Sequence, residues 1–170
     1  MNLILFLHNI RSAHNVGSII RSAEGFGVSQ IIYSGWTPVP ENACPEALPH
    51  VTEKVTAQIS KTALGAEKLV PGFWTRDIDM GLVELRAEGW KIVGLENNIK
   101  DERLHALPEF RELGLGDRVA LVLGEETRGI PEELHDLIDV FLEIPMKGKK
   151  ESYNVSVAAG IALYELLGRE

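Results

Sequence analysis

The stretch RVALVLGEETRGIPEELHDLI, residues 118–138, carries a clear fold signal. RVALVLG (118–124) is an almost continuous apolar run that ends in glycine, which is typical of a buried strand. A short helix is expected over 131–138, because Pro131 suits the first helical position and the two glutamates after it favour the positive end of a helix dipole. A buried strand, a loop and a helix in this order indicate an α/β fold.

The loop inside this stretch is charged. Glu125, Glu126 and Arg128 lie between Gly124 and Gly129. Ligands of open α/β sheets bind beyond the carboxyl ends of the strands, which is where this loop would lie. Taken alone, the segment fits an ordinary strand-to-helix connection equally well.

The rest of the chain repeats the alternation of apolar strands and amphipathic helices. We expect one domain over residues 1–170, an α/β fold with a mostly parallel sheet flanked by helices. The Pro-rich stretch 36–49 is expected to be a loop. The expected strands are 2–8, 30–35, 90–96, 118–124 and 139–145, and the expected helices are 15–27, 51–68, 77–89, 131–138 and 153–168.

Composition limits the classes of function. No apolar run approaches the ~18 residues of a membrane span, and a single cysteine, Cys44, favours a reducing compartment such as the cytoplasm. The five histidines lack metal-ligand spacing, so no metal site is expected. Nucleotide-binding Gly-x-Gly-x-x-Gly and P-loop patterns are missing too. The net charge of −8 gives no general attraction to nucleic acid, so RNA binding would need a local basic patch.

Two further segments carry polar residues that packing does not require. In HNVGSIIR (14–21), Asn15 stands at a helix-cap position, Gly17 would let a ligand or another chain approach the backbone, and Arg21 lies nearly opposite the apolar stripe. A capped helix with a solvated arginine explains this segment by itself.

The second segment is IPMKGKKESYNVSVAAGIALYEL (144–166). Ser152 or Asn154 would cap the final helix, but capping does not explain the lysines at 147, 149 and 150. The helix is apolar nearly all round, so it must be covered on several sides. Burial within the chain and burial in a dimer account for this equally well.

Together and in this order, these segments resemble the SpoU (TrmH-like) branch of the SPOUT superfamily of RNA methyltransferases. The matching motifs are Asn15, Gly17 and Arg21; Gly124, Glu126 and Gly129; and Ile144-Pro145-Met146 followed by Ser152 to Val157. Tyr153 and Glu125 depart from the residues usual in the family, Leu and Pro. The resemblance implies a C-terminal trefoil knot, a homodimer and S-adenosylmethionine-dependent methyl transfer to a ribose 2′-OH of tRNA or rRNA. A related alternative is an RNA-binding protein of this fold without turnover, and a third is a small-molecule-binding domain unrelated to RNA.

The resemblance also implies roles for individual residues. The catalytic set is Arg21, Asn15, Glu126, Ser152 and Asn154. Cofactor contacts are expected from Leu95, Gly124, Ile144, Met146, Tyr153 and Asn154. Residues expected to bind RNA are Arg11, Arg21, Arg128, Lys147, Lys149 and Lys150.

Overall fold

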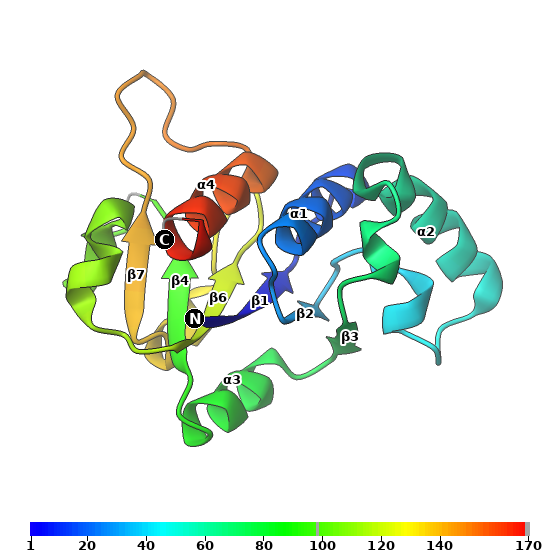
Figure 1. The fold of residues 1–170 in the computed structure, drawn as a ribbon, viewed down its shortest axis with the longest axis horizontal. Helices are drawn as coiled ribbons and strands as arrows, with labels where there is room; N and C mark the ends of the chain where they lie inside the picture. The colour runs from blue at the N-terminus through cyan, green and yellow to red at the C-terminus, as the bar shows by residue number, and fades with distance from the viewer. Residues whose placement is uncertain (98, 169–170) are drawn as a thin grey trace.

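The computed structural model describes residues 1–97 and 99–168, and within them seven strands form one sheet (Figure 1). The strand order is β3-β2-β1-β6-β4-β7-β5, and every neighbouring pair in this described sheet is parallel. The expected α/β fold with a parallel sheet is therefore confirmed. The strands are β1 (Asn2–His8), β2 (Gln30–Ser34), β3 (Gly72–Thr75), β4 (Lys91–Leu95), β5 (Leu104–Ala106), β6 (Arg118–Leu123) and β7 (Val140–Glu143).

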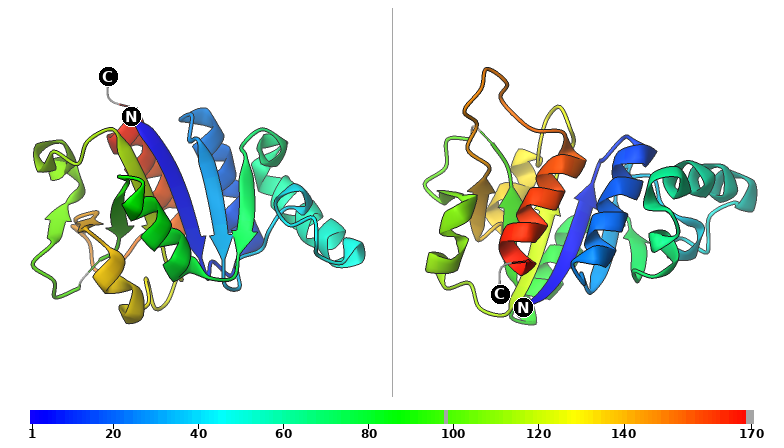
Figure 2. Two further views of the ribbon diagram at one scale, coloured as in Figure 1. Left: turned by 90° about the horizontal axis from the view of Figure 1, so that it is seen from below. Right: turned by 45° about the horizontal axis from the view of Figure 1, so that its top comes forward.

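Helices cover both faces of the sheet (Figure 2). Strand β1 shows the division, because its alternate side chains enter different cores: Leu3, Leu5 and Leu7 pack with α1, α2 and α4, whereas Ile4 and Phe6 pack with α3 and η4. The α-helices are α1 (Ala13–Gly25), α2 (Pro49–Ala63), α3 (Ile78–Ala87) and α4 (Val155–Leu167). The 3-10 helices are η1 (Glu41–Ala43), η2 (Ala66–Lys68), η3 (Leu107–Leu113) and η4 (Glu132–Leu137).

Several expected boundaries were wrong. The expected helix 131–138 is the 3-10 helix η4, and the expected helix 51–68 ends at Ala63, because Leu64 adopts a left-handed conformation. Strands β3 and β5, at the two edges of the sheet, were missed. The capping residue of α4 is Asn154, whose side chain accepts a hydrogen bond from the Ser156 amide.

The start of α1 corrects two interpretations of the Asn15 motif. Ser12 caps this helix by accepting from the Asn15 amide, so Asn15 lies inside the first turn with its side chain free for another role. Gly17 faces α2 and not a ligand: a Cβ atom there would come within 3.0 Å of the Ile59 carbonyl oxygen and the Thr62 hydroxyl. The glycine is needed for close packing of the two helices.

Helix α4 is only partly covered. Ala159, Ala162 and Leu163 are buried, but Val157 is 49% exposed and Tyr164 is 51% exposed. Burial within the described chain thus accounts for one side of this apolar helix and leaves another side open. None of the described helices combines the length and apolar character that crossing a membrane requires.

Candidate active site at the carboxyl edge of the sheet

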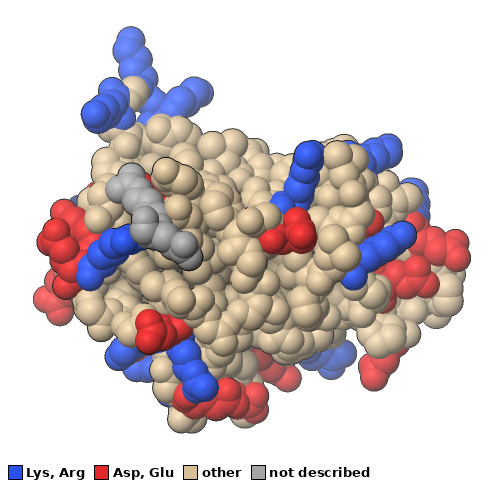
Figure 3. All heavy atoms as spheres, in the orientation of Figure 1, with Lys and Arg blue, Asp and Glu red and all other residues tan. Residues whose placement is uncertain are grey.

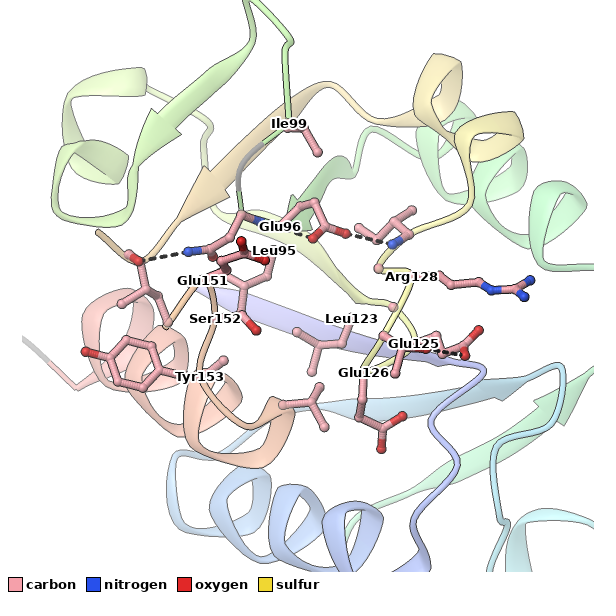
Figure 4. Close-up of a pocket in the computed structure, with 18 of the residues that line it drawn as sticks. Leu95, Glu96, Ile99, Leu123, Glu125, Glu126, Arg128, Glu151, Ser152 and Tyr153 are labelled. Atoms are coloured by element: carbon pink, nitrogen blue, oxygen red, sulfur yellow. Dashed lines mark hydrogen bonds between the residues drawn. The ribbon is translucent and has the colours of Figure 1, made fainter. Parts of the chain in front are cut away.

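A cavity of about 350 Å³ lies where the chain leaves the carboxyl ends of three adjacent strands, β6, β4 and β7. Figure 4 shows Glu126 and Arg128 on the loop after β6, and Ser152 and Tyr153 on the segment before α4; all four line the cavity. This is the edge at which ligands bind in open α/β sheets. The lining comprises Leu95, Glu96, Asn97, Ile99, Leu123 to Ile130, Glu132, His135, Ile144, Glu151 to Tyr153, Val155 and Ala158.

The loop after β6 is folded back on itself. Glu125 and Gly129 exchange two backbone hydrogen bonds, of 3.0 and 2.9 Å. Gly129 has a φ of +70°, which favours glycine, and a Cβ at Gly124 would collide with the Gly129 backbone. Both glycines of the motif are therefore required by the backbone path of the loop.

Glu96 and Asn97 connect the three loops, and the sequence did not predict them as site residues. The Glu96 carboxylate accepts from the Ile130 amide at 2.7 Å, while the Asn97 side chain donates to the Ile144 carbonyl at 3.0 Å (Figure 4). The pair thereby fixes the end of β4 to the loops after β6 and β7. The only signal in the sequence was two polar residues directly after a buried strand.

The three motifs of the sequence meet beside the cavity in a chain of hydrogen bonds. Asn15 donates through its side-chain amide to Glu126 at 3.0 Å, and the Asn154 amide donates to the Asn15 oxygen at 3.3 Å. The first bond joins residues that are 111 positions apart in the sequence, and the second joins residues that are 139 positions apart. Asn154 and Glu126, both members of the expected catalytic set, are thus connected through Asn15.

The carboxyl group of Glu126 is held as an anion. Burial acts to raise its pKa, but hydrogen bonds from the Asn15 side chain and from backbone amides, including those of Arg11 and Ser12, outweigh burial and lower the pKa below its ordinary value. At neutral pH the group is thus a fixed negative charge and hydrogen-bond acceptor.

Arg11 is not an unpaired cation. Its guanidinium forms an ion pair of 2.6 Å with Glu125, and its backbone amide donates to Glu126. The side chain stays 66% exposed, so a phosphate could approach it only in competition with Glu125. The pairing has no local signal in the sequence, because the two residues lie on separate loops.

The remaining residues of the expected sets divide into two groups. The first group lines the cavity and comprises Leu95, Gly124, Ile144, Ser152 and Tyr153, with Glu126 and Arg128. The second group lies outside the described lining and includes Met146 and Asn154. Arg21 also lies outside the lining; it is exposed and forms no side-chain hydrogen bond or ion pair with the described residues. Within the described residues, Arg21 is therefore not hydrogen-bonded to any other member of the expected catalytic set.

The basic patch is confined to the loop between β7 and α4. Lys147, Lys149 and Lys150 are all exposed, and Figure 3 shows positively charged side chains gathered at the tip of this projecting loop. The loop continues into Glu151, Ser152 and Tyr153, which line the cavity. Cationic groups therefore stand next to an otherwise acidic pocket.

Comparison with known proteins supports the motif assignment. Residues 2–164 match the model of the SpoU rRNA Methylase family. The chain is 32% identical over 164 residues to the 23S rRNA (guanosine-2′-O-)-methyltransferase RlmB of Coxiella burnetii, covering 96% of this chain and 57% of that protein. The chain therefore spans little more than half the length of the curated relatives that it matches.

Solved structures show the same fold. The TrmH/SpoU tRNA modifying enzyme of A. aeolicus is 28% identical with a TM-score of 0.74, over 98% of this chain and 74% of that one. The SpoU methyltransferase AviRb of Streptomyces viridochromogenes, crystallised with AdoMet, is 24% identical with a TM-score of 0.73, over 98% of this chain and 60% of that one. On the match over residues 2–164, this chain belongs to the SpoU rRNA Methylase family.

Proposed function

We propose that this protein transfers a methyl group from S-adenosylmethionine to a ribose 2′-OH of tRNA or rRNA. The observation that carries the proposal is the hydrogen-bonded chain of Glu126, Asn15 and Asn154 beside the cavity at the carboxyl edge. Family membership supports it, as do the names of relatives that methylate rRNA at the guanosine 2′-O position.

The cavity suits a cofactor that carries positive charge. Its charged lining is mostly acidic, with Glu96, Glu125, Glu126, Glu132 and Glu151 against Arg128. An adenine ring would be held by the apolar side chains and main-chain groups of Leu95, Ile144 and Tyr153. An anionic nucleotide would be repelled by the same carboxylates, whereas the sulfonium and amino groups of S-adenosylmethionine would be attracted. When bound, the cofactor supplies an electrophilic methyl group on sulfur.

The chain's own residues would position the hydroxyl and stabilise charge on it. Glu126 is ionised and already engaged by Asn15 and the Arg11 amide, so it serves to orient Asn15. Ser152, on the opposite wall, is placed to hydrogen-bond the sugar. An arginine side chain stays protonated at neutral pH, so Arg21 would stabilise the developing alkoxide and hold a phosphate. The hydroxyl proton would pass to water as the methyl group is transferred.

Arg21 would reach the reacting atoms in a homodimer. It is exposed and outside the cavity of its own chain, while the surface over α4 and beside α1 shows few charged side chains (Figure 3). The exposed Val157 and Tyr164 on α4 supply apolar area for such an interface. A second copy docked on α1 and α4 would place its Arg21 near the cavity of the first.

Mixed dimers test this arrangement. Chains carrying Arg21→Ala and chains carrying Glu126→Gln, each inactive alone, are combined by joint refolding. If Arg21 serves the partner's site, the heterodimer contains one intact site and recovers up to about half of the wild-type activity per dimer. If Arg21 serves its own chain, both sites of the heterodimer are defective and no activity returns.

Three further features belong to the same proposal. The segment after β7 would be threaded into the trefoil knot of the SPOUT superfamily, which is supported by the convergence of the loops after β4, β6 and β7 on one cavity. RNA phosphates would be contacted by the exposed loop lysines and two arginines, namely Lys147, Lys149, Lys150, Arg128 and Arg11. The reaction would take place in the cytoplasm, where tRNA and rRNA are found and where a lone cysteine stays reduced.

The decisive experiment is incubation of the protein with methyl-labelled S-adenosylmethionine and total RNA, followed by separation of the RNA by size. Label in ribose-methylated nucleosides of tRNA or rRNA is expected, and Arg21→Ala should abolish it while cofactor binding persists. RNA binding without any labelled nucleoside would instead support the alternative of a family member without turnover.

A further inference from the structure

Trp36 is the most exposed large hydrophobic side chain of the described residues, with 85% of its surface accessible. Only Gly35 separates it from the end of β2, at the carboxyl edge of the sheet, and it begins the Pro-rich stretch 36–49. The other tryptophans contrast with it: Trp74 is half-buried and Trp90 is 9% exposed. An indole that projects so fully into solvent has no role in the core of this chain.

The backbone that carries Trp36 is held firmly. The Asn9 side chain accepts from the Trp36 amide at 3.0 Å and hydrogen-bonds to the His8 ring at 2.9 Å, while His8 bonds to Ser34 at 2.9 Å. The Thr37 hydroxyl, which is buried, accepts from the Ile10 amide at 3.1 Å and lies 2.8 Å from the Leu7 carbonyl. The turn is therefore ordered on both sides of the exposed ring.

Backbone geometry adds to this rigidity. Asn9 and Gly35 both adopt left-handed conformations, with φ of +58° and +62°. A Cβ at Gly35 would collide with the Asn9 side chain, so these two residues fit together as a unit. The ring is presented by a preorganised turn, which lowers the entropy that a ligand must overcome on binding.

The same contacts connect Trp36 to the candidate active site. Asn9 is two residues from Arg11, a span of at most about 7 Å, and Arg11 bonds to Glu125 and Glu126. Strand β2 is separated from β6 by β1 alone, so their carboxyl ends lie roughly 10 Å apart at the usual strand spacing. This is a distance that neighbouring nucleotides of one RNA strand can bridge.

We infer that Trp36 is a stacking platform for an unpaired RNA base next to the nucleotide that is methylated. The inference rests on the proposed function and extends it, because it assigns substrate recognition to the turn after β2. Unstacked bases bind to exposed aromatic rings in single-stranded RNA, and stacking tolerates any base because each has a π-face. The expected substrate is therefore a loop or bulge, with a ribose at Asn15 and Glu126 and an adjoining base on the indole.

The first test is direct binding to the wild-type protein. A short oligoadenylate should quench the fluorescence of the exposed Trp36, and the same oligonucleotide paired with its complement should quench it much less. The quenching should be lost in Trp36→Phe, which leaves Trp74 and Trp90 as the emitters. Equal quenching by paired and unpaired RNA, or no quenching, would overturn the inference.

The second test separates recognition from catalysis. In Trp36→Leu the RNA affinity should fall roughly 5- to 150-fold, the range expected for loss of one stacked base, whereas kcat at saturating RNA and the affinity for S-adenosylmethionine should hold. Trp36→Phe should retain most of the affinity because it keeps an aromatic ring. Phe73→Ala, which removes a side chain 44% exposed on β3, is the matched control and should match the wild type.

Two outcomes would count against the inference. Unchanged RNA affinity in Trp36→Leu would show that no RNA base stacks on this ring. Dissociation of a dimer by Trp36→Leu would show that the ring contacts a second copy of the chain instead. Failure of the proposed function can be told apart from failure of this inference. The first would appear as no methyl transfer by the wild-type protein, whereas the quenching test does not depend on turnover.

Discussion

Replacing Gly17 by alanine should destabilise the protein, although the same change in most helices is stabilising. Alanine is favoured over glycine in a helix interior by about 1 kcal/mol. At Gly17 the new Cβ would lie within 3.0 Å of the Ile59 carbonyl oxygen and the Thr62 hydroxyl, whereas ordinary contacts begin at 3.4 Å. Helices α1 and α2 would therefore have to separate.

The magnitude follows from three contributions. Overpacking of a tight interior costs about 1–3 kcal/mol, and separating the helices weakens the 2.9 Å hydrogen bond from the Thr62 hydroxyl to the His14 carbonyl, a loss of about 1 kcal/mol. The helix-propensity gain offsets about 1 kcal/mol of this. A net loss of about 2 kcal/mol corresponds to a fall in Tm of about 4–8 °C for a chain of this size.

The assay is urea and thermal unfolding followed by circular dichroism, with Gly25→Ala as the matched control. Gly25 ends the same helix, but a Cβ there meets nothing within 4 Å, so stability should hold or rise slightly. Methyl transfer should fall in Gly17→Ala, since Asn15 moves with α1 away from Glu126. If Gly17→Ala were as stable as Gly25→Ala, close helix packing would not be the reason for the glycine.

Three other changes test individual contacts. Asn154→Ala should lower the unfolding free energy by about 1 kcal/mol through loss of the helix cap. Asn154→Asp should keep the cap and the stability but lose methyl transfer, because an aspartate cannot donate to Asn15. Equal stability of the two variants would contradict the capping role. Because the folded-state pKa of Glu126 is lowered, its ionised form stabilises the fold above the ordinary value of 4.5. The stability gap between wild type and Glu126→Gln, measured by urea unfolding, should therefore be largest near neutral pH and shrink as pH falls below that value; a gap independent of pH would refute it. Arg103→Ala should lower the unfolding free energy by about 2 kcal/mol, because Arg103 donates to the carbonyls of His135 and Ile138. The same change should raise the pKa of Asp101, measured by NMR, from about 2 towards 3.8. An unchanged pKa would show that the Arg103 hydrogen bond does not lower it.

The sequence predicted the central strands better than the edges. Strand β6 was evident because burial on both faces leaves a continuous apolar run, RVALVL. Strands β3 (GFWT) and β5 (LHA) are short, and each pairs with a single neighbour. Their extended form is imposed by pairing with β2 and β7, which leaves no periodic pattern in the sequence.

The candidate site was predictable only as separate motifs. Asn15, Glu126 and Asn154 were selected through the resemblance of three motifs to the SpoU (TrmH-like) family, and the structure brings these three residues together. The sequence misjudged Asn15 as a cap because asparagine is common at that position, while Ser12 three residues earlier meets the same need. The bridge from Glu96 to Ile130 joins residues 34 positions apart and leaves no local pattern in the sequence.

The folded loop after β6 has a consequence for how this site can change over evolutionary time. A Cβ at Gly124 would occupy the space of the Gly129 backbone, and a Cβ at Gly129 would occupy the space of the Glu96 carboxylate. A side chain at Gly124 would require the Gly129 backbone to shift, and one at Gly129 would have to displace the Glu96 carboxylate and adopt a left-handed conformation. Sequence variation around the cavity is therefore expected at lining positions other than these two glycines.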